Sequence, residues 1–303
     1  MPRRLQYQQN RRHVHPLDPN NAFRMTVAFQ GVAGAYSEAA AAQLYPDATP
    51  APYDTFDAVF AAVESSTVEA GVVPIENSLF GSVHANYDHL RTHRVHVEVG
   101  QFLRIRHCLM APSGATMAAI EAVHSHPQAL GQCQGYLSDT LPQAQSVAAY
   151  DTAGAARDVA ESGAPTHAAI ASRQAASEYG LQVLAEGIED HDRNYTRFLG
   201  LRAGKADDHV HPQANRTSVV FALRENVPGA LFKSLAVFAL RELDLCKMES
   251  RPQFGTPGQY LFYIDVAGSY ADLPLRRALD HLREITTEQK LLGAYYEAPV
   301  PSA

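Results

Sequence analysis

This sequence has few cysteines, no long apolar run and no excess of positive charge. Its three cysteines, Cys108, Cys133 and Cys246, are far apart and odd in number, which fits neither a disulfide framework nor the spacing of a zinc site. We therefore expect a reducing compartment, the cytoplasm. No apolar stretch approaches the length of a membrane span, and the formal net charge of −7 has the wrong sign for binding nucleic acid. The sequence thus predicts a cytoplasmic protein with neither a membrane nor a nucleic acid as its partner.

The chain has the length and composition of an ordinary globular protein with two domains. It has 303 residues, of which 46% are hydrophobic and 19% are charged. Residues 1–24 are rich in Gln, Asn, Arg and Pro, which predicts a disordered N-terminal tail. The arginines of this tail are followed by no apolar segment, so we expect no secretory signal. Met25 directly precedes the first predicted strand, and we expect the ordered protein to begin there.

Predicted strands and helices alternate over residues 25–203, which is typical of a mainly parallel sheet covered by helices. A polar linker follows at 204–214. Over 215–297 the order of predicted elements changes to βαββαβ, the order of a ferredoxin-like module. The sequence therefore predicts an α/β protein in which a larger first domain is followed by a smaller second one.

Four polar loops follow predicted strands of the first domain, at 31–37, 76–78, 124–128 and 191–197. Polar side chains at the carboxyl ends of strands lie where open α/β sheets bind ligands. The amides of the helix that starts after the first loop would favour an anion. Tight turns and helix caps would explain each loop equally well on its own. Two lobes with a cleft between them would bring the four loops together.

Six groups of residues stand in a fixed order along the chain. They are Phe29-Gln30-Gly31 with Gly34-Ala35-Tyr36-Ser37, Val73-Pro74-Ile75-Glu76-Asn77-Ser78, Ser125-His126-Pro127-Gln128 with Gln132-Cys133, Asn194-Tyr195-Thr196-Arg197-Phe198, Gly229-Ala230-Leu231, and Glu249-Ser250-Arg251-Pro252. Together they resemble the prephenate dehydratases of phenylalanine biosynthesis, and the resemblance extends over almost all of 27–296. Each group alone is a weak signal, whereas six in the order of the family are specific.

The resemblance implies a catalytic domain built like a type II periplasmic binding protein, with the active site between its lobes. Lobe one would comprise 25–104 and 189–203, and lobe two 105–188. Residues 215–297 would form an ACT regulatory domain that binds L-phenylalanine as a feedback inhibitor across the interface of a homodimer or homotetramer. The family implies no cofactor and no metal. The fourteen histidines also give no sign of a metal site, because no pair has a carboxylate at the spacing of a zinc-protease helix.

The same groups of residues imply which side chains form the two sites. The catalytic residue would be Thr196. We expect substrate binding by Ser37, Asn77, Ser78, Ser125, Gln132, Arg197 and Phe198. We expect phenylalanine binding by Gly229, Ala230, Leu231, Glu249, Ser250, Arg251 and Pro252. Two alternatives stay open for Arg197, a carboxylate contact in the cleft or an ion pair outside it, because neighbouring residues of a strand face opposite sides.

Prephenate loses carbon dioxide and its ring hydroxyl to give phenylpyruvate, so the protein must hold two carboxylates and assist the leaving hydroxyl. Threonine is a poor acid, and we expect it to donate a hydrogen bond to the departing oxygen. Neutral donors suit this reaction, because a strong cation against the departing carboxylate would stabilise the ground state. Two other functions remain possible. One is an arogenate dehydratase, which performs the same elimination on the aminated substrate. The other is a non-enzymatic module that binds a small ligand.

Overall fold

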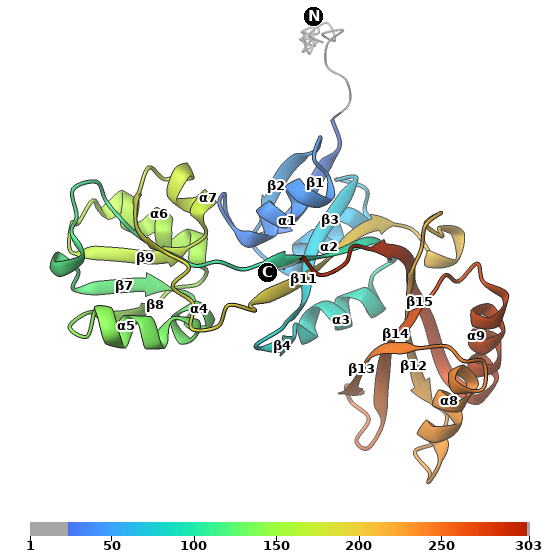
Figure 1. The fold of residues 1–303 in the computed structure, drawn as a ribbon. Coiled ribbons are helices and arrows are strands. Elements are labelled where there is room, and N and C mark those ends of the chain that lie inside the picture. Colours follow the sequence, from blue (N-terminus) through green and yellow to red (C-terminus); the bar gives the residue numbers. More distant parts are fainter. Residues whose placement is uncertain (1–23, 302–303) are drawn as a thin grey trace, which may run out of the picture.

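The computed structural model describes residues 24–301, which form three units arranged in a row (Figure 1). The predicted N-terminal tail, 1–24, lies outside the described residues apart from Arg24. Within the described range, no helix is long and apolar enough to cross a membrane. We call the three units lobe one, lobe two and the C-terminal unit.

Lobe one, in the centre of Figure 1, is a mixed sheet covered by helices. Its strands are β1 (Thr26–Gln30), β2 (Thr49–Tyr53), β3 (Ala70–Asn77), β4 (Gly81–Ser82), β5 (Val95–Arg104) and β11 (Tyr195–Ala203). Its helices are α1 (Tyr36–Leu44), α2 (Phe56–Glu64) and α3 (His84–Thr92). The strands are arranged in the order β5-β11-β3-β1-β2, and the short β4 pairs with β3.

Lobe two is a separate five-stranded sheet with its own helices. Its strands are β6 (Cys108–Ala111), β7 (Ala122–Ser125), β8 (Gln145–Ala148), β9 (His167–Ala171) and β10 (Gln182–Glu186). Its helices are α4 (Pro127–Gln132), α5 (Gln134–Thr140), α6 (Thr152–Ser162) and α7 (Arg173–Glu178), with a 3-10 turn at Met117–Ala119. The strand order is β10-β6-β9-β7-β8. The chain enters this lobe after β5 and leaves it before β11, so two segments connect the lobes.

The C-terminal unit has the predicted βαββαβ order. Its elements are β12 (Arg216–Leu223), α8 (Ala230–Ala239), β13 (Leu245–Pro252), β14 (Tyr260–Ala267), α9 (Leu273–Ile285) and β15 (Thr286–Glu297). The strands are arranged in the order β13-β14-β12-β15. The end of β15 then pairs with β5 of lobe one, where Tyr296 lies opposite Val99 and Glu297 opposite Gly100. Lobe one and the C-terminal unit therefore share one ten-stranded sheet.

The α/β class and the two-lobed architecture predicted from the sequence are confirmed, but the expectation of a mainly parallel sheet is wrong for lobe one. Strands β1, β2 and β3 are parallel, whereas β11 runs antiparallel to both β3 and β5. The chain returns from lobe two in the opposite direction, and periodicity carries no information on direction. The sequence analysis also missed β2, whose prolines Pro50 and Pro52 are tolerated because it is the edge strand.

Polar side chains define where several helices begin. Thr55, Asp151 and Ser172 each accept a hydrogen bond from an amide in the first turn of α2, α6 and α7. His126 caps α4 in the same way, with its Nδ1 accepting from the Gln128 amide at 3.2 Å. The helical segment that begins after His126 is interrupted at Cys133, between α4 and α5. These caps place the starts of α4 and α6 at the edge of lobe two that faces lobe one.

Lobe one and the C-terminal unit also share a hydrophobic core. Tyr263 and Tyr295 of the C-terminal unit are buried in the same cluster as Tyr87 and Leu90 of α3. The rings of Tyr87 and Tyr263 meet at 63° with their centroids 5.0 Å apart. At Gly293 a β carbon would lie 2.5 Å from the carbonyl oxygen of Val97, so only glycine allows this backbone approach. The C-terminal unit is therefore packed into lobe one.

Two stacked histidines join the linker to lobe one. The rings of His96 on β5 and His209 lie 4.5 Å apart at an angle of 8°. The His96 side chain is buried, and desolvation, with the neighbouring His209, lowers its pKa from 6.5 to about 4. Burial thus keeps His96 neutral in the folded protein at pH values where an unfolded chain would protonate it.

We expect the free energy of unfolding to fall as the pH drops from about 6.5 to about 4. In this range the His96 imidazole is protonated in the unfolded chain but stays neutral in the folded protein. The two pKa values give a loss of about 2 kcal/mol at pH 5. Urea unfolding at pH 7.5 and pH 5 should therefore differ less for His96→Gln than for the unaltered protein. Identical pH dependence in the two proteins would refute this assignment.

Candidate active site

A cleft of about 510 Å³ lies between lobe one and lobe two, a size that suits a small molecule. Lobe one contributes Ser37, Thr196 and Phe198 to its wall, and lobe two contributes Gln132. Asn77, at the end of β3, also lines it. All four loops singled out in the sequence supply residues to this one cleft. Residues at the start of α1 in lobe one and at the start of α4 in lobe two line it.

The position of Thr196 follows from how β11 pairs in the sheet. Thr196 lies opposite Asn77 of β3 on one side and opposite Leu103 of β5 on the other. Residues that face each other across two strands project to the same side. Asn77 Nδ2 accordingly donates a hydrogen bond of 3.0 Å to Thr196 Oγ1 and another of 2.9 Å to Asn194 Oδ1. The Thr196 hydroxyl is thus held at the cleft, and no residue within 24–301 accepts its hydrogen.

A row of hydrogen bonds continues from this point into lobe two. Asn194 Nδ2 donates to Gln132 Oε1 at 2.9 Å, and His107 Nε2 is 2.6 Å from the same oxygen. Since Gln132 Oε1 takes part in both contacts, the Nε2 hydrogens are the part of Gln132 that is left for a ligand. The row connects Thr196 and Asn194 of lobe one with Gln132 and His107 of lobe two.

Asn77 was expected to contact the substrate, but the structure gives it a different task. Both of its amide hydrogens are used, by Thr196 and Asn194, and its Oδ1 accepts from the amides of Leu79 and Phe80 at 2.9 and 3.1 Å. A side-chain amide has two hydrogens to donate, and none is left for a ligand. Asn77 therefore orients Thr196.

The expected contacts of Ser78 and Ser125 with a substrate are wrong, because the backbone takes up both hydroxyls. Ser125 is fully buried and donates to the Ile170 carbonyl at 2.6 Å. Ser78 donates to the Arg193 carbonyl at 2.8 Å and accepts from the Tyr195 amide at 2.9 Å. Neither lines the cleft. Ser78 fixes the start of β11, and Ser125 joins β7 to β9.

Arg197 points away from the cleft, so the expectation that it binds substrate is wrong and the alternative of an ion pair holds. Its guanidinium makes ion pairs with Asp265 at 2.6 Å and Glu297 at 2.5 Å. It also donates to the hydroxyl of Tyr295 at 2.8 Å. The alternation of side chains along β11 is the physical reason, because Thr196 and Arg197 must face opposite sides.

The sequence analysis missed two residues, Tyr36 and His107, that complete the row at the cleft. The Tyr36 hydroxyl lies 3.0 Å from His107 Nδ1, and their rings meet at 80°. Burial lowers the pKa of His107 and raises that of Tyr36 well above 10, so both are neutral at pH 7. Tyr36 stood within one of the quoted groups, next to Ser37. Nothing in the local pattern marks His107, which lies between two strands.

The electrostatics of the cleft are unusual for a site that would hold carboxylates. Among the described residues that line it there is no lysine or arginine, whereas Asp151 is present. The positive end of the α1 helix dipole supplies part of the positive charge that a lysine or arginine would otherwise provide. This helix starts at Tyr36, its N-cap residue Ala35 has no side chain that could cap it, and Tyr36 and Ser37 both line the cleft. Uncapped amides at a helix start attract anions.

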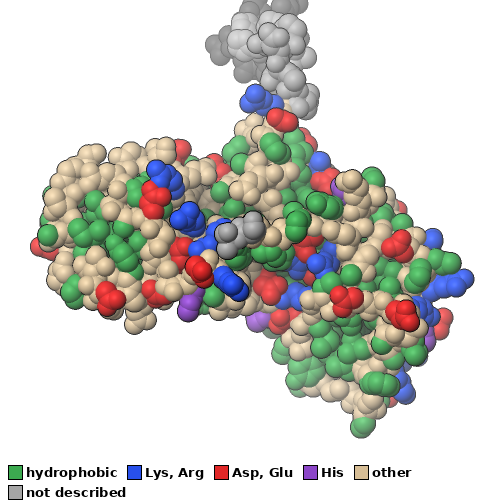
Figure 2. All heavy atoms as spheres, in the orientation of Figure 1, with side chains coloured by type: hydrophobic (Ala, Val, Ile, Leu, Met, Phe, Trp, Pro, Cys, Tyr) green, Lys and Arg blue, Asp and Glu red, His purple; other side chains and the backbone are tan. Residues whose placement is uncertain are grey.

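The residues expected to bind phenylalanine lie on two elements of the C-terminal unit. Gly229 is the N-cap of α8, with φ +82° favouring glycine, and Ala230 and Leu231 begin that helix. Residues 249–252 end β13. The polar members of β13 contact lobe one, since Glu249 accepts from Ser82 Oγ at 2.7 Å and Arg251 lies 2.5 Å from Asp88. Figure 2 shows acidic and basic side chains mixed over this junction.

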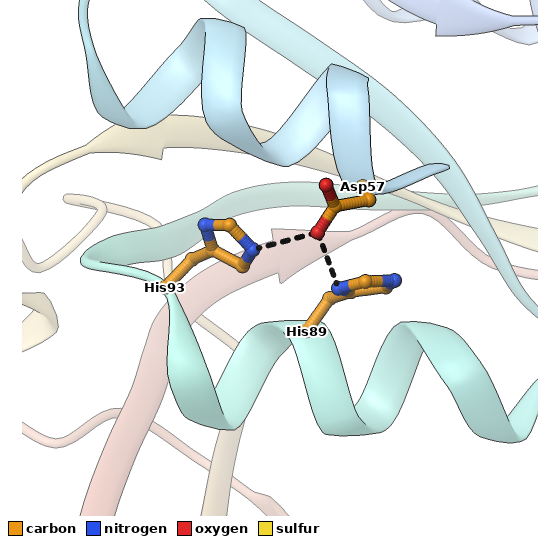
Figure 3. Close-up of side chains that lie close together, drawn as sticks. All are labelled: Asp57, His89 and His93. Carbon is orange, nitrogen blue, oxygen red and sulfur yellow. Dashed lines mark ion pairs between the residues drawn. The ribbon is translucent and has the colours of Figure 1, made fainter. Parts of the chain in front are cut away.

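One group of side chains in lobe one has the composition of a metal site. Asp57, His89 and His93 place one potential ligand atom each within 4.8 Å of one another, and Figure 3 shows both imidazoles directed at the carboxylate. The distances from Asp57 Oδ1 are 3.7 Å to His89 and 3.6 Å to His93, whose Nδ1 also lies 2.8 Å from Glu64. Contacts of His89 on α3 and of His93, which directly follows α3, with the carboxylates of α2 account for the group, which does not line the cleft.

Comparison with known proteins identifies the family. A model of the family described as "Prephenate dehydratase" matches residues 27–206. "Arogenate dehydratase/prephenate dehydratase 2, chloroplastic" of Arabidopsis thaliana is 45% identical over 288 residues, covering 91% of this chain and 74% of the relative.

Two solved structures match over most of their length. A prephenate dehydratase from Arthrobacter aurescens in complex with L-Phe is 33% identical with a TM-score of 0.84, covering 92% of both chains. A protein titled "GqqA- a novel type of quorum quenching acylases" is 34% identical with a TM-score of 0.81, covering 90% of this chain and 98% of its own.

These comparisons correct one expectation and confirm another. The predicted cytoplasmic location is wrong, because relatives from Arabidopsis thaliana are named as chloroplastic, and sparse unpaired cysteines fit any reducing compartment. The resemblance drawn from the six groups of residues is confirmed. The chain belongs to the prephenate dehydratase family of hydro-lyases.

Proposed function

We propose that the chain converts prephenate to phenylpyruvate, the step that removes water and carbon dioxide on the way to phenylalanine. The observation that carries this proposal is the Thr196 hydroxyl, which lies at a cleft between two lobes with its oxygen occupied by Asn77 and its hydrogen free. Neutral groups around it favour the release of a carboxylate as carbon dioxide, because they do not stabilise the ground-state anion strongly.

The arrangement assigns a task to each wall of the cleft. Breaking the bond to the ring carboxylate supplies an electron pair that aromatises the ring and expels the hydroxyl, which takes up a proton from solvent and leaves as water. Thr196 Oγ1 donates a hydrogen bond to that departing oxygen. Gln132 Nε2 and the amides at the start of α1 hold carboxylate oxygens, and Phe198 and Ser37 line the space for the ring and its substituents.

The substrate itself is tested by comparing kcat/KM for prephenate and for arogenate with purified protein. Prephenate is expected to be preferred. A preference for arogenate would instead assign the same elimination on the aminated substrate, as the names of several relatives state for those proteins. Turnover of neither compound, with tight binding of one, would leave a non-enzymatic ligand-binding module.

An acylase is a second candidate function, because one similar structure carries that title. Hydrolysis of an amide would need an activated nucleophile, and the usual activation is a histidine hydrogen-bonded to a hydroxyl. In the described residues Thr196 is hydrogen-bonded to Asn77, and His107 to Tyr36 and Gln132. No serine or threonine of the described cleft is hydrogen-bonded to a histidine, which favours the dehydratase.

We further propose that the C-terminal unit, 215–297, is an ACT domain joined by the linker 204–214 to a catalytic domain at 25–203. The proposal is supported by the βαββαβ order and by the L-Phe complex of the relative from Arthrobacter aurescens. Phenylalanine would bind at residues 229–231 and 249–252 and inhibit the enzyme.

We propose a homodimer, or a tetramer of two such dimers, formed through the C-terminal units. Strand β13 is the edge of the large sheet and has one neighbour, β14. Apolar side chains on this unit are exposed, and Figure 2 shows such side chains on its surface. They include Phe232, Leu240, Met248, Phe254 and Tyr260. Sedimentation analysis should give at least two chains per particle, and a monomer would contradict the assembly.

Arg251→Ala should weaken inhibition by phenylalanine by about 5–150-fold, the usual size of an allosteric coupling, and spare uninhibited turnover. The change removes a cation from the proposed effector site, and inhibition curves would measure it. Asp88→Asn is the matched control, because it breaks the ion pair between Asp88 and Arg251 and leaves the guanidinium in place. Equal loss of inhibition in both variants would assign the effect to that ion pair instead.

A further inference from the structure

We propose that Arg197 is a positioning residue through which the C-terminal unit holds the Thr196 hydroxyl in the cleft. The inference rests on the proposed role of Thr196 in catalysis and adds a mechanical requirement to it. Arg197 touches neither the cleft nor any group that would react. It would act on turnover only through the neighbouring residue.

All three hydrogen bonds that the Arg197 guanidinium makes within the described residues go to the C-terminal unit. Nε donates to Glu297, Nη1 to Asp265 and Nη2 to the Tyr295 hydroxyl. The distances are 2.5, 2.6 and 2.8 Å, and the side chain is 5% exposed. A planar guanidinium has donors fixed in direction, so three acceptors on two strands determine its position.

The acceptors are themselves held within the C-terminal unit. Ser218 Oγ donates to Asp265 and lies 2.8 Å from the Tyr295 hydroxyl. Arg216 makes a second ion pair with Glu297 at 2.9 Å. The cluster thus balances two buried carboxylates with two guanidinium groups, one of which comes from lobe one. Charges buried in this way need their partners, so Arg197 has a strong preference for this one place.

On its β3 side, the pairing of β11 is interrupted one residue after Thr196, whereas its pairing with β5 stays regular from Tyr195 to Gly200. The pairing of β11 with β3 is regular at Thr196 and shifts register between Arg197 and Phe198. Such a bulge interrupts the ladder of hydrogen bonds and bends the strand. A side chain anchored on the opposite face compensates for this interruption. Because Arg197 follows Thr196 directly, the anchor fixes which way the hydroxyl points.

A buried ion pair with a purely structural role would predict a different outcome. Its loss would lower stability and leave the turnover of each folded molecule unchanged. A contact with substrate would predict a third outcome, a higher KM at similar kcat. Positioning predicts a lower kcat at similar KM, and an effect that disappears when the Thr196 hydroxyl is absent.

The test is a double-mutant cycle with Arg197→Lys, Thr196→Ala and both changes together, using the full chain. Lysine keeps the charge and cannot span three acceptors. We expect Arg197→Lys to lower kcat by about 10–100-fold, the usual effect of a misplaced reacting group, with KM within about 3-fold. In the Thr196→Ala background the same change should alter kcat by less than about 2-fold. Circular dichroism would check that each variant is folded.

Tyr295→Phe offers a milder version should Arg197→Lys fail to fold, because it removes one acceptor and conserves volume. It should lower kcat by about 3–10-fold and lose this effect in the Thr196→Ala background. An equal fold loss of kcat with threonine and with alanine at position 196 would overturn the inference. A change confined to KM or to the melting temperature would overturn it as well. Near-normal turnover of Thr196→Ala alone is a separate result, which would overturn the proposed role of Thr196 itself.

Discussion

Thr196→Ala is expected to lower kcat by about 10²–10³-fold while the fold survives. The change removes a hydroxyl at the cleft whose oxygen already accepts from Asn77 and whose hydrogen, unclaimed by any described residue, can meet a departing oxygen. The fold should tolerate it because Asn77 keeps its bond to Asn194 and its two bonds from backbone amides. Steady-state rates of phenylpyruvate formation would measure the loss.

Two further substitutions at Thr196 separate the hydroxyl from the shape of the side chain. Thr196→Val keeps the branched shape and removes the hydroxyl, so it should be as impaired as the alanine variant. Thr196→Ser keeps the hydroxyl and should remain within about 10-fold of the unaltered protein. Near-normal turnover of the valine variant would remove Thr196 from the mechanism.

Gly34→Ala is expected to lower the free energy of unfolding by about 2–4 kcal/mol, the sum of a strained backbone and an overpacked contact. Gly34 has φ +84°, and a β carbon there would lie 2.6 Å from Cα and 2.8 Å from Cβ of Ala175 in lobe two. Ser172 Oγ donates to the Gly34 carbonyl at 2.6 Å, so the loop has no room to withdraw. Urea unfolding would measure the loss.

Turnover should fall in the same variant, because the loop at Gly34 leads directly into the start of α1 at the cleft. Gly163→Ala is the matched control. Gly163 also has positive φ, at +61°, but a β carbon there would meet nothing within 4 Å. The Gly163→Ala substitution should lower the free energy of unfolding only by the backbone strain, about 1 kcal/mol, and should leave turnover unchanged. Equal losses in both variants would mean that the contact with Ala175 is unimportant.

Some features of this site follow from local sequence pattern, whereas others depend on contacts between segments that are distant in sequence. That loops near Ser37, Gln132 and Thr196 converge on one cleft could be predicted, because polar loops after strands converge in an α/β fold of this type, whereas the choice of individual residues rested on the family resemblance. His107 could not, because its part in the site depends on contacts with Tyr36 and Gln132 that have no counterpart in local pattern.

The incorrect assignments have a common physical cause. Ser78, Ser125 and Asn77 have the right chemistry for a ligand and lie in the right loops, but nearby backbone or side-chain groups use their hydrogen bonds. Sequence alone does not say which partner a short polar side chain will find. For Arg197 the alternation along a strand gave two alternatives, and three acceptors more than sixty residues away determined the outcome.

The direction of β11 shows the same limit at the level of the fold. Periodicity identifies 195–203 as a strand, yet its antiparallel pairing depends on the chain leaving for lobe two and returning. The C-terminal unit was easier to predict, because all six of its elements are consecutive in sequence. Its fusion with the sheet of lobe one depends on two residue pairs, Tyr296 with Val99 and Glu297 with Gly100, and no local pattern predicts them.

That fusion has a consequence for solubility. Without β15, the outer side of β5 would present unpaired amides and carbonyls beside the apolar Val97 and Val99, a surface on which strands of other molecules can dock. The last strand of the chain covers the middle of this edge. The same segment therefore also shields the rest of the protein from aggregation.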